Sequence, residues 1–174
     1  MTIIRGISKD MKTSFDLSLH LAQAADAHAI ADMSRELIEY GLDWRWTERR
    51  VAASIKAANT NVLVARIDHQ LAGFGIMKYG DQVSHLNLFA VAPEFRRTGI
   101  GRQLLHWLER CALVAGNIAV SLEVRASNTG AQQFYESMGY RGFVELPGYY
   151  QGVEPAVRMG RRLTGLNFTR NNHL

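Results

Sequence analysis

Residues 96–101, with the sequence RRTGIG, carry the types of residue that bind a phosphate group. Glycines at the start of a helix let the backbone approach a ligand closely, and the free N–H groups there favour an anion. Arginines beside them can hold phosphate oxygens through paired N–H groups. No Gly-Lys-Ser/Thr or correctly spaced third glycine follows, which excludes a Walker A loop and a dinucleotide fingerprint. We expect a phosphate-binding turn, the alternative being a loop whose glycines only cap and pack the helix.

Two residues have side chains suited to accepting a proton, Glu123 and His85. Glu123 lies in the strand-like segment 118–124, on the face opposite from its apolar neighbours. A carboxylate in such surroundings is expected to have a raised pKa. The alternative is a structural glutamate paired with Arg125 or with a backbone amide. Histidine titrates in the range needed for base catalysis, but a lone histidine on a strand can also be structural.

Tyr135 is the candidate proton donor. A phenol with an ordinary pKa of about 10 is protonated at neutral pH and can protonate a leaving group. The alternative is an amphipathic core tyrosine that shares a helix stripe with Phe134 and Met138.

The composition of the 174-residue chain is that of a globular protein, with 47% hydrophobic and 21% charged residues. Its single cysteine, Cys111, cannot form an internal disulfide, which favours a reducing compartment and a cytoplasmic location. No segment has the apolar length of a signal peptide core or a membrane span. The net charge of +4 comes with clustered arginines rather than a long basic run, which favours a compact phosphate ligand over nucleic acid.

Several of the remaining basic side chains are expected to have no catalytic part. We interpret Arg158, Arg161 and Arg162 as a solvated face on or beyond the last strand. No metal site is predicted, because five histidines are scattered without ligand spacing. They are His20, His28, His69, His106 and His173.

The elements that position these residues follow from hydrophobic periodicity. Strands are predicted at 15–21, 61–67, 71–79, 83–91, 118–124, 140–146 and 156–163, with a Gly-rich loop at 147–152. Helices are predicted at 24–40, at 99–115 and at 128–138. A further helix is predicted from the N-cap Thr47 through Ala58. This order predicts a mixed α/β sheet flanked by helices. We expect one domain over residues 15–163, a frayed N-terminus at 1–14 and a polar tail at 164–174.

Two segments together resemble the signatures of the GNAT acetyltransferases. The R-x-x-G-x-G turn at 96–101 after the segment AVAPEF resembles motif A of that family, and LEVRASNTGAQQFYESMGY resembles its second signature. The resemblance covers roughly residues 15–163. It implies a central, mostly antiparallel sheet of about seven strands flanked by about four helices, with a splayed pair of central strands. It also implies acetyl-CoA as cosubstrate and direct transfer to an amine in a ternary complex.

The resemblance assigns cosubstrate contacts to specific positions. Phe89, Ala90 and Val91 would offer backbone groups to the pantetheine arm and to the oxyanion, and Asn128 would bond the pantetheine region. Tyr135 would lie near the thioester sulfur. The residues that would surround the pyrophosphate are Arg96, Arg97, Thr98, Gly99, Ile100, Gly101 and Arg102.

The segment LEVRASN resembles most closely the ribosomal-protein alanine N-acetyltransferases of bacteria, in which this Glu is the base and this Tyr the acid. Tyr149 and Tyr150 would then line the acceptor entrance, or else form a surface turn. Trp44 lies where the fold shapes its acceptor site, and it either stacks on the acceptor or fills the core. His85 replaces the catalytic Glu of lysine-acetylating relatives and is the rival base, with a water as a further alternative.

The acceptor itself is left open by the sequence. A peptide or protein N-terminus is the first expectation, and a small-molecule amine or a catalytically idle CoA-binding module are the alternatives. The acyl-chain preference is not predicted, and the chain is expected to be a monomer or a homodimer.

Overall fold

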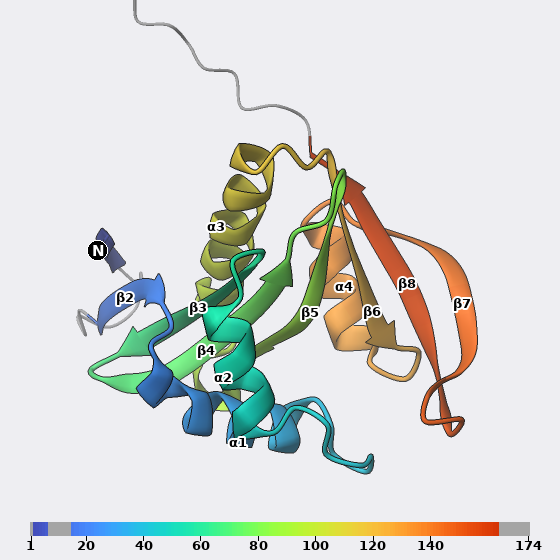
Figure 1. Ribbon diagram of the computed structural model, residues 1–174, viewed down its shortest axis with the longest axis horizontal. Coiled ribbons are helices and arrows are strands. Elements are labelled where there is room, and N and C mark those ends of the chain that lie inside the picture. Colours follow the sequence, from blue (N-terminus) through green and yellow to red (C-terminus); the bar gives the residue numbers. More distant parts are fainter. Residues whose placement is uncertain (1, 7–14, 164–174) are drawn as a thin grey trace, which may run out of the picture.

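The apolar segments of the chain form one eight-stranded sheet with the order β1-β2-β3-β4-β5-β6-β8-β7 (Figure 1). The computed structural model describes residues 2–6 and 15–163. The strands are β1 (Thr2–Gly6), β2 (Phe15–Leu21), β3 (Thr60–Ile67), β4 (Gln70–Lys78), β5 (Val83–Val91), β6 (Ala119–Arg125), β7 (Arg141–Tyr150) and β8 (Glu154–Arg162). The helices are α1 (Ala27–Leu37), α2 (Glu48–Lys56), α3 (Ile100–Val114) and α4 (Thr129–Ser137), with short 3-10 turns at Ala24–Asp26 and Pro93–Phe95. The predicted mixed sheet with four helices is confirmed.

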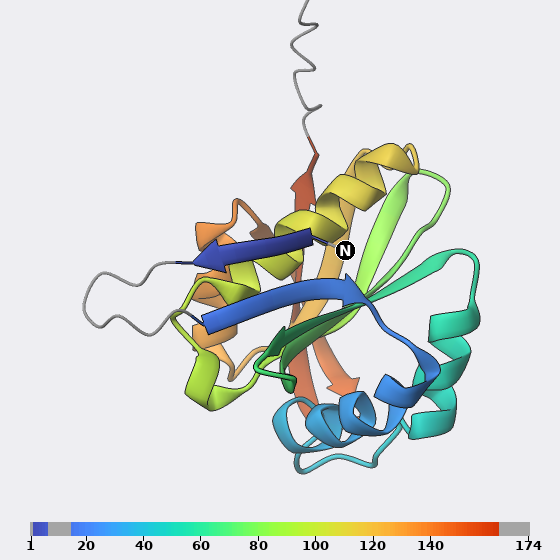
Figure 2. The same ribbon diagram turned by 90° about the vertical axis from the view of Figure 1, so that its left-hand side faces the viewer.

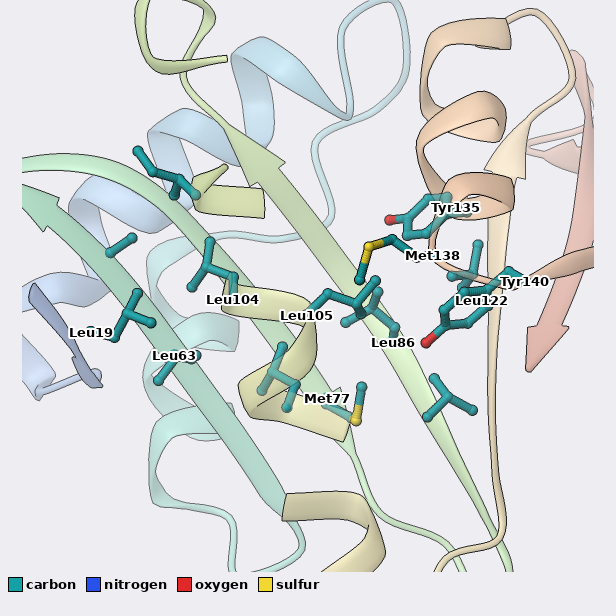
Figure 3. Packing of buried hydrophobic residues seen from close by; sticks show 14 of the residues in the cluster. Leu19, Leu63, Met77, Leu86, Leu104, Leu105, Leu122, Tyr135, Met138 and Tyr140 are labelled. Atoms are coloured by element: carbon teal, nitrogen blue, oxygen red, sulfur yellow. The ribbon is translucent and has the colours of Figure 1, made fainter. Parts of the chain in front are cut away.

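The helices cover the two faces of the sheet in pairs (Figures 1 and 2). Side chains alternate along β3, so that Leu63 packs with α3 and α4 whereas Val62 packs with α1 and α2. The face under α3 and α4 holds the larger cluster, which includes Leu104, Leu122 and Tyr135 (Figure 3). Burial of these apolar side chains stabilises the sheet at about 25 cal/mol per Å².

Strands β5 and β6 are the only parallel neighbours in the described sheet, and they separate after a short contact. Their pairing runs from Val83 with Ala119 to His85 with Ser121 and then ends. The β4–β5 register shifts at the same point, because Leu86 and Leu88 oppose consecutive residues of β4 and leave Asn87 unmatched. Such a bulge bends its strand. The gap between β5 and β6 therefore opens just beyond His85, as the expected splayed pair requires.

The structure corrects three boundaries predicted from the sequence. Residues 2–6, expected to be frayed, form β1 and pair with β2, which makes eight strands rather than about seven. The predicted loop at 147–152 is largely strand, since β7 continues to Tyr150 with an irregular register. The first helix is shorter than predicted and ends at Leu37. The tail at 164–174 lies outside the described residues.

No helix in the described part of the chain has the length and apolarity to cross a membrane. Nor do its His, Cys, Asp and Glu side chains form a group of three or more that could hold a metal ion.

Candidate active site

The turn between β5 and α3 presents backbone N–H groups to solvent. Gly99 is the N-cap of α3, with φ of +90°, a left-handed conformation that glycine adopts without strain. A side chain at Gly99 would meet no atom within 4 Å, so the turn is open above this residue. The first N–H groups of a helix have no partner within the helix. The turn therefore has the backbone geometry of an anion site.

Arginine side chains surround the same turn. Arg96 donates from Nε to the carbonyl of Val91 at 3.1 Å, and the Thr98 hydroxyl donates to the carbonyl of Phe95 at 2.6 Å. The first bond ties the turn to the end of β5, and the second joins it to the 3-10 turn at Pro93–Phe95. Arg97 and Arg102 are exposed, and neither forms an ion pair with a described residue. Both guanidinium groups are therefore available to a phosphate ligand.

His85 and Glu123 are in direct contact where β5 and β6 separate. The His85 Nε2 atom lies 3.0 Å from Glu123 Oε2, and its Nδ1 atom lies 3.1 Å from the Ser121 hydroxyl oxygen. If Nε2 carries the proton and donates it to the carboxylate, Nδ1 accepts from Ser121. Strand pairing sets this arrangement, since His85 and Ser121 are register partners and Glu123 lies two residues further on the same face of β6.

The Glu123 carboxylate is enclosed by donors, with only 5% of its side chain exposed. Arg158 donates from Nε to Oε1 at 2.6 Å, and the Tyr149 hydroxyl donates to Oε2 at 3.2 Å. Burial by itself raises the pKa of Glu123, but hydrogen bonds and charge from His85 and Arg158 lower it to about 2. The predicted raised pKa is wrong, because partners from β5 and β8 outweigh the apolar neighbours along β6.

Two of the three arginines expected to lie on a solvated face have different roles in the structure. Arg158 binds Glu123, and Arg161 binds the buried Glu109 at 3.0 Å. Only Arg162 is exposed as predicted. Arg125, the predicted alternative partner of Glu123, instead binds Glu154 at 2.7 Å. No local signal in the sequence gives these pairs, because they depend on the register between β6 and β8.

Tyr135 projects from α4 into the larger core cluster (Figure 3). Its ring packs against Phe89, Phe134 and Tyr140, with centroids 6.3, 5.3 and 5.6 Å away. No hydrogen bond from its hydroxyl to a described residue is formed, in contrast to Tyr140, whose hydroxyl donates to Glu109 at 2.9 Å. Burial, followed by the nearby Tyr150, raises the Tyr135 pKa above its ordinary value. The group is protonated at neutral pH and has an unused donor.

Some of the groups predicted to contact the cosubstrate already form hydrogen bonds within the protein. Asn128 is the N-cap of α4 and accepts from the Ala131 N–H at 3.0 Å through its side-chain oxygen. Phe89, Ala90 and Val91 line the open edge of β5 beyond its pairing with β6, where backbone groups have no partner strand on that side. The carbonyl of Val91 is already the acceptor for Arg96.

The face of the sheet that carries Glu123 is bordered by tyrosines and by the segment 38–47. The Tyr150 hydroxyl lies 3.4 Å from the Glu123 carbonyl, and the ring packs edge-on against Tyr149 at 5.0 Å. Trp44 is 37% exposed, with Arg35 over its ring at 5.1 Å, so it does not fill the core.

Two contacts hold segment 38–47 beside this face. Arg125 donates to the carbonyls of Ile38 and Tyr40, both at 2.8 Å. The Gln151 side chain forms two hydrogen bonds with the backbone of Asp43, each at 3.0 Å. The segment that carries Trp44 is therefore fixed against β6 and the β7–β8 turn. Neither Arg125 nor Gln151 is recognisable as a positioning residue from the sequence, because both contacts join segments far apart along the chain.

Comparison with known proteins gives one family and several relatives. A family model described as an acetyltransferase (GNAT) domain matches residues 29–162. The chain is 41% identical over 99 residues to an uncharacterized N-acetyltransferase of Methanocaldococcus jannaschii, which covers 55% of this chain and 62% of that protein. It thus spans less than two thirds of that relative's length.

A second relative is covered more completely. The chain is 32% identical over 117 residues to the ribosomal protein bS18-alanine N-acetyltransferase of Escherichia coli, covering 66% of this chain and 78% of that protein. The crystal structure of the ribosomal-protein-S18-alanine N-acetyltransferase from Escherichia coli aligns with a TM-score of 0.73 at 26% identity, over 87% of this chain and 97% of that one.

Proposed function

The chain belongs to the GNAT acetyltransferase family, and we propose from this premise that it transfers an acetyl group from acetyl-CoA to the α-amine of a peptide or protein. The observation that carries the proposal is the gap between β5 and β6. An anion-binding turn lies at one end of it, and Glu123, His85 and Tyr135 gather along it. The name of the Escherichia coli relative, a protein-alanine N-acetyltransferase, supports a protein acceptor.

The residues present fit acetyl-CoA as cosubstrate. The open turn at Gly99, with Arg97 and Arg102 exposed beside it, suits the pyrophosphate through free N–H groups and guanidinium donors. The unpaired edge of β5 at Phe89–Val91 suits the amide groups of an extended pantetheine arm. When bound, acetyl-CoA supplies the acetyl group as an activated thioester.

The open edge of β5 also has donors for the reacting carbonyl. Negative charge develops on the carbonyl oxygen as the amine attacks, and backbone N–H groups already in place stabilise it without reorganisation. The bulge at Asn87 directs this part of β5 away from β6, so the N–H groups of the following residues face the gap.

Tyr135 is the proton donor in this proposal. Its hydroxyl is protonated and forms no hydrogen bond to a described side chain. The ring lies on the face of the sheet that α4 covers. Breaking the carbon–sulfur bond leaves a thiolate, and the phenol donates its proton to the sulfur. The rigid aromatic cluster of Phe89, Phe134 and Tyr140 fixes the position of the phenol ring.

His85 takes up the proton that the amine loses, and Glu123 stabilises the imidazolium that results. Glu123, with a pKa of about 2, is a weak base, but it is ionised throughout the physiological range. Its contact with Nε2 at 3.0 Å orients the ring and places a negative charge beside the imidazolium that forms when Nδ1 accepts a proton. Ser121, at 3.1 Å from Nδ1, is placed to pass the proton to the ring.

Thermal unfolding with and without acetyl-CoA tests the cosubstrate half of the proposal. A ligand at about 100 times its Kd stabilises the folded state by about 2.7 kcal/mol, which raises Tm by several degrees in a domain of this size. The shift should be smaller in Arg97→Ala and unchanged in Arg162→Gln, which removes an exposed arginine away from the turn. No shift in the unmodified protein would reject acetyl-CoA as its ligand.

An acceptor panel tests the other half. A peptide with a free N-terminus, the same peptide with a blocked N-terminus and one free lysine, and a set of small amines are each offered with acetyl-CoA. Modification of the first peptide alone supports the α-amine assignment. Modification of the small amines alone would replace it with a small-molecule acceptor, and binding of acetyl-CoA without transfer to any amine would indicate an idle CoA-binding module.

A further inference from the structure

Arg158 is a charged group at the acceptor side of the site that the proposed reaction does not use. It lies on β8 as the register partner of Glu123, on the face opposite from Val157 and Met159, which pack into the core. Its Nε atom donates to Glu123 Oε1 at 2.6 Å. A guanidinium group has five N–H donors, so four remain on the two terminal nitrogens.

Within residues 2–6 and 15–163, neither terminal nitrogen of Arg158 donates to a side chain or a carbonyl, and 39% of the side chain is exposed. By contrast, Arg125 uses both of its terminal nitrogens, on Glu154 and on two carbonyls. Glu123 thus holds Arg158 through Nε, while the two terminal nitrogens keep N–H groups that can bind a carboxylate as a pair.

In the proposed reaction the acceptor amine approaches His85, which Glu123 links to this guanidinium. Glu123 contacts His85 through Oε2 and Arg158 through Oε1. One residue of extended chain spans at most about 3.6 Å, so a carboxylate on the first or second residue of the acceptor lies within a side chain's reach of Arg158. A cationic second residue would meet the same charge and be repelled.

We propose that Arg158 determines acceptor specificity by binding a carboxylate carried next to the reacting amine. This inference rests on the proposed transfer to an α-amine and names the class of acceptor more closely. The carboxylate belongs either to an acidic residue near a peptide N-terminus or to a free amino acid. The exposed ring of Tyr149, whose hydroxyl also bonds Glu123, forms the wall beside this position.

The test compares three peptides that differ only at the second residue, which is Asp, Asn or Lys. All three have an amidated C-terminus, so that no terminal carboxylate is present. A second arm compares a free amino acid with its amide, which separates the two sources of the carboxylate. We expect kcat/KM for the Asp peptide or the free acid to exceed that of its neutral counterpart at least tenfold, with Lys poorest. Equal values for Asp, Asn and Lys, together with equal values for acid and amide, would overturn the proposal.

Variants separate recognition from a structural role. In Arg158→Gln, KM for the acidic acceptor should rise about tenfold with KM for the Asn peptide little changed, and Arg158→Lys should recover part of the difference. Arg162→Gln, on the same strand and exposed, is the matched control and should leave the preference intact. Equal slowing of every acceptor in Arg158→Gln would mean that Arg158 only positions Glu123, which contradicts recognition.

If Arg158→Gln does not fold, the wild-type comparison of acceptors still decides the matter. Failure of the proposed function looks different from failure of this inference. In the former no acceptor is acetylated at all, whereas in the latter acceptors are acetylated without regard to their charge.

Discussion

Glu123 and Tyr135 approach the gap between β5 and β6 from opposite faces of the sheet. Tyr135 packs with Leu122 and Val124 on the face covered by α4, whereas Glu123 points to the other face and binds His85 and its cross-strand partner. The proposed proton acceptor and the proposed proton donor thus lie on opposite faces of the sheet, separated by the thickness of one strand. An amine can enter from one face while the thiol leaves from the other.

This separation predicts direct transfer between two substrates that are bound at the same time. Double-reciprocal plots at several acetyl-CoA concentrations should give intersecting lines. Cys111, the one cysteine in the sequence, lies on α3 beside Tyr79 and outside the gap, so Cys111→Ser should retain activity. Parallel lines, or acetyl label that stays on the protein without an acceptor, would contradict direct transfer.

Gly99→Ala should damage both stability and cosubstrate binding. A left-handed conformation costs a residue with a Cβ about 1–2 kcal/mol, and the substitution also stiffens the turn proposed to hold the pyrophosphate. Gly116→Ala is the matched control, because Gly116 has φ of +86° and equally open surroundings at the other end of α3. Denaturant unfolding should show similar losses for the two variants, and KM for acetyl-CoA should rise only for Gly99→Ala. A rise of similar size in both would remove the turn from the binding site.

Tyr135→Phe should lower kcat by about 100-fold or more with little effect on unfolding, because the hydroxyl bonds no residue that the structure describes and the ring is kept. Tyr140→Phe should do the reverse. It removes the hydrogen bond to buried Glu109, costing about 1–3 kcal/mol, and leaves kcat near the wild-type value. Steady-state kinetics and chemical unfolding of the two variants check the pair. Full activity in Tyr135→Phe would reassign the proton donor.

Substitutions should distinguish His85 from Glu123 as the proton acceptor. The pKa of Glu123 is about 2, so this carboxylate is ionised where the enzyme is assayed and is a weak base. We expect His85→Gln to lower kcat/KM by about 100-fold or more, because it removes the group that accepts the proton. Glu123→Gln should lower kcat/KM less, because it removes only the carboxylate that orients the ring. Steady-state kinetics of the two variants check this order, and full activity in His85→Gln would return the role to Glu123 or to a water.

Glu123 should also contribute to stability against acid. Its pKa of about 2 in the folded protein lies below the ordinary value of 4.5, so its contribution is present above about pH 4.5 and is lost as the pH falls toward 2. The free energy of unfolding of Glu123→Gln should therefore approach that of the wild type as the pH falls through this range. A difference between the two proteins that stays constant from pH 4.5 to pH 2 would contradict this contribution.

Local patterns predicted the elements well, since alternation along 15–21 gives β2 with its exact bounds and Gly99 marks the start of α3. The glycine turn and Tyr135 were proposed as site residues from residue type and context. The direction of the Glu123 pKa shift could not be predicted in this way, because it depends on Arg158, 35 residues away along the chain. That contact exists only once β6 and β8 pair in one particular register, which no single segment encodes.

The most direct test of the account is mass spectrometry of a peptide with a free N-terminus and an internal lysine after incubation with acetyl-CoA and the protein. We expect one added acetyl group, located on the α-amine by fragmentation, and its loss in Tyr135→Phe. Acetylation of the lysine with the α-amine untouched would contradict the proposed acceptor. No acetylation of this or any other amine would contradict the proposed activity itself.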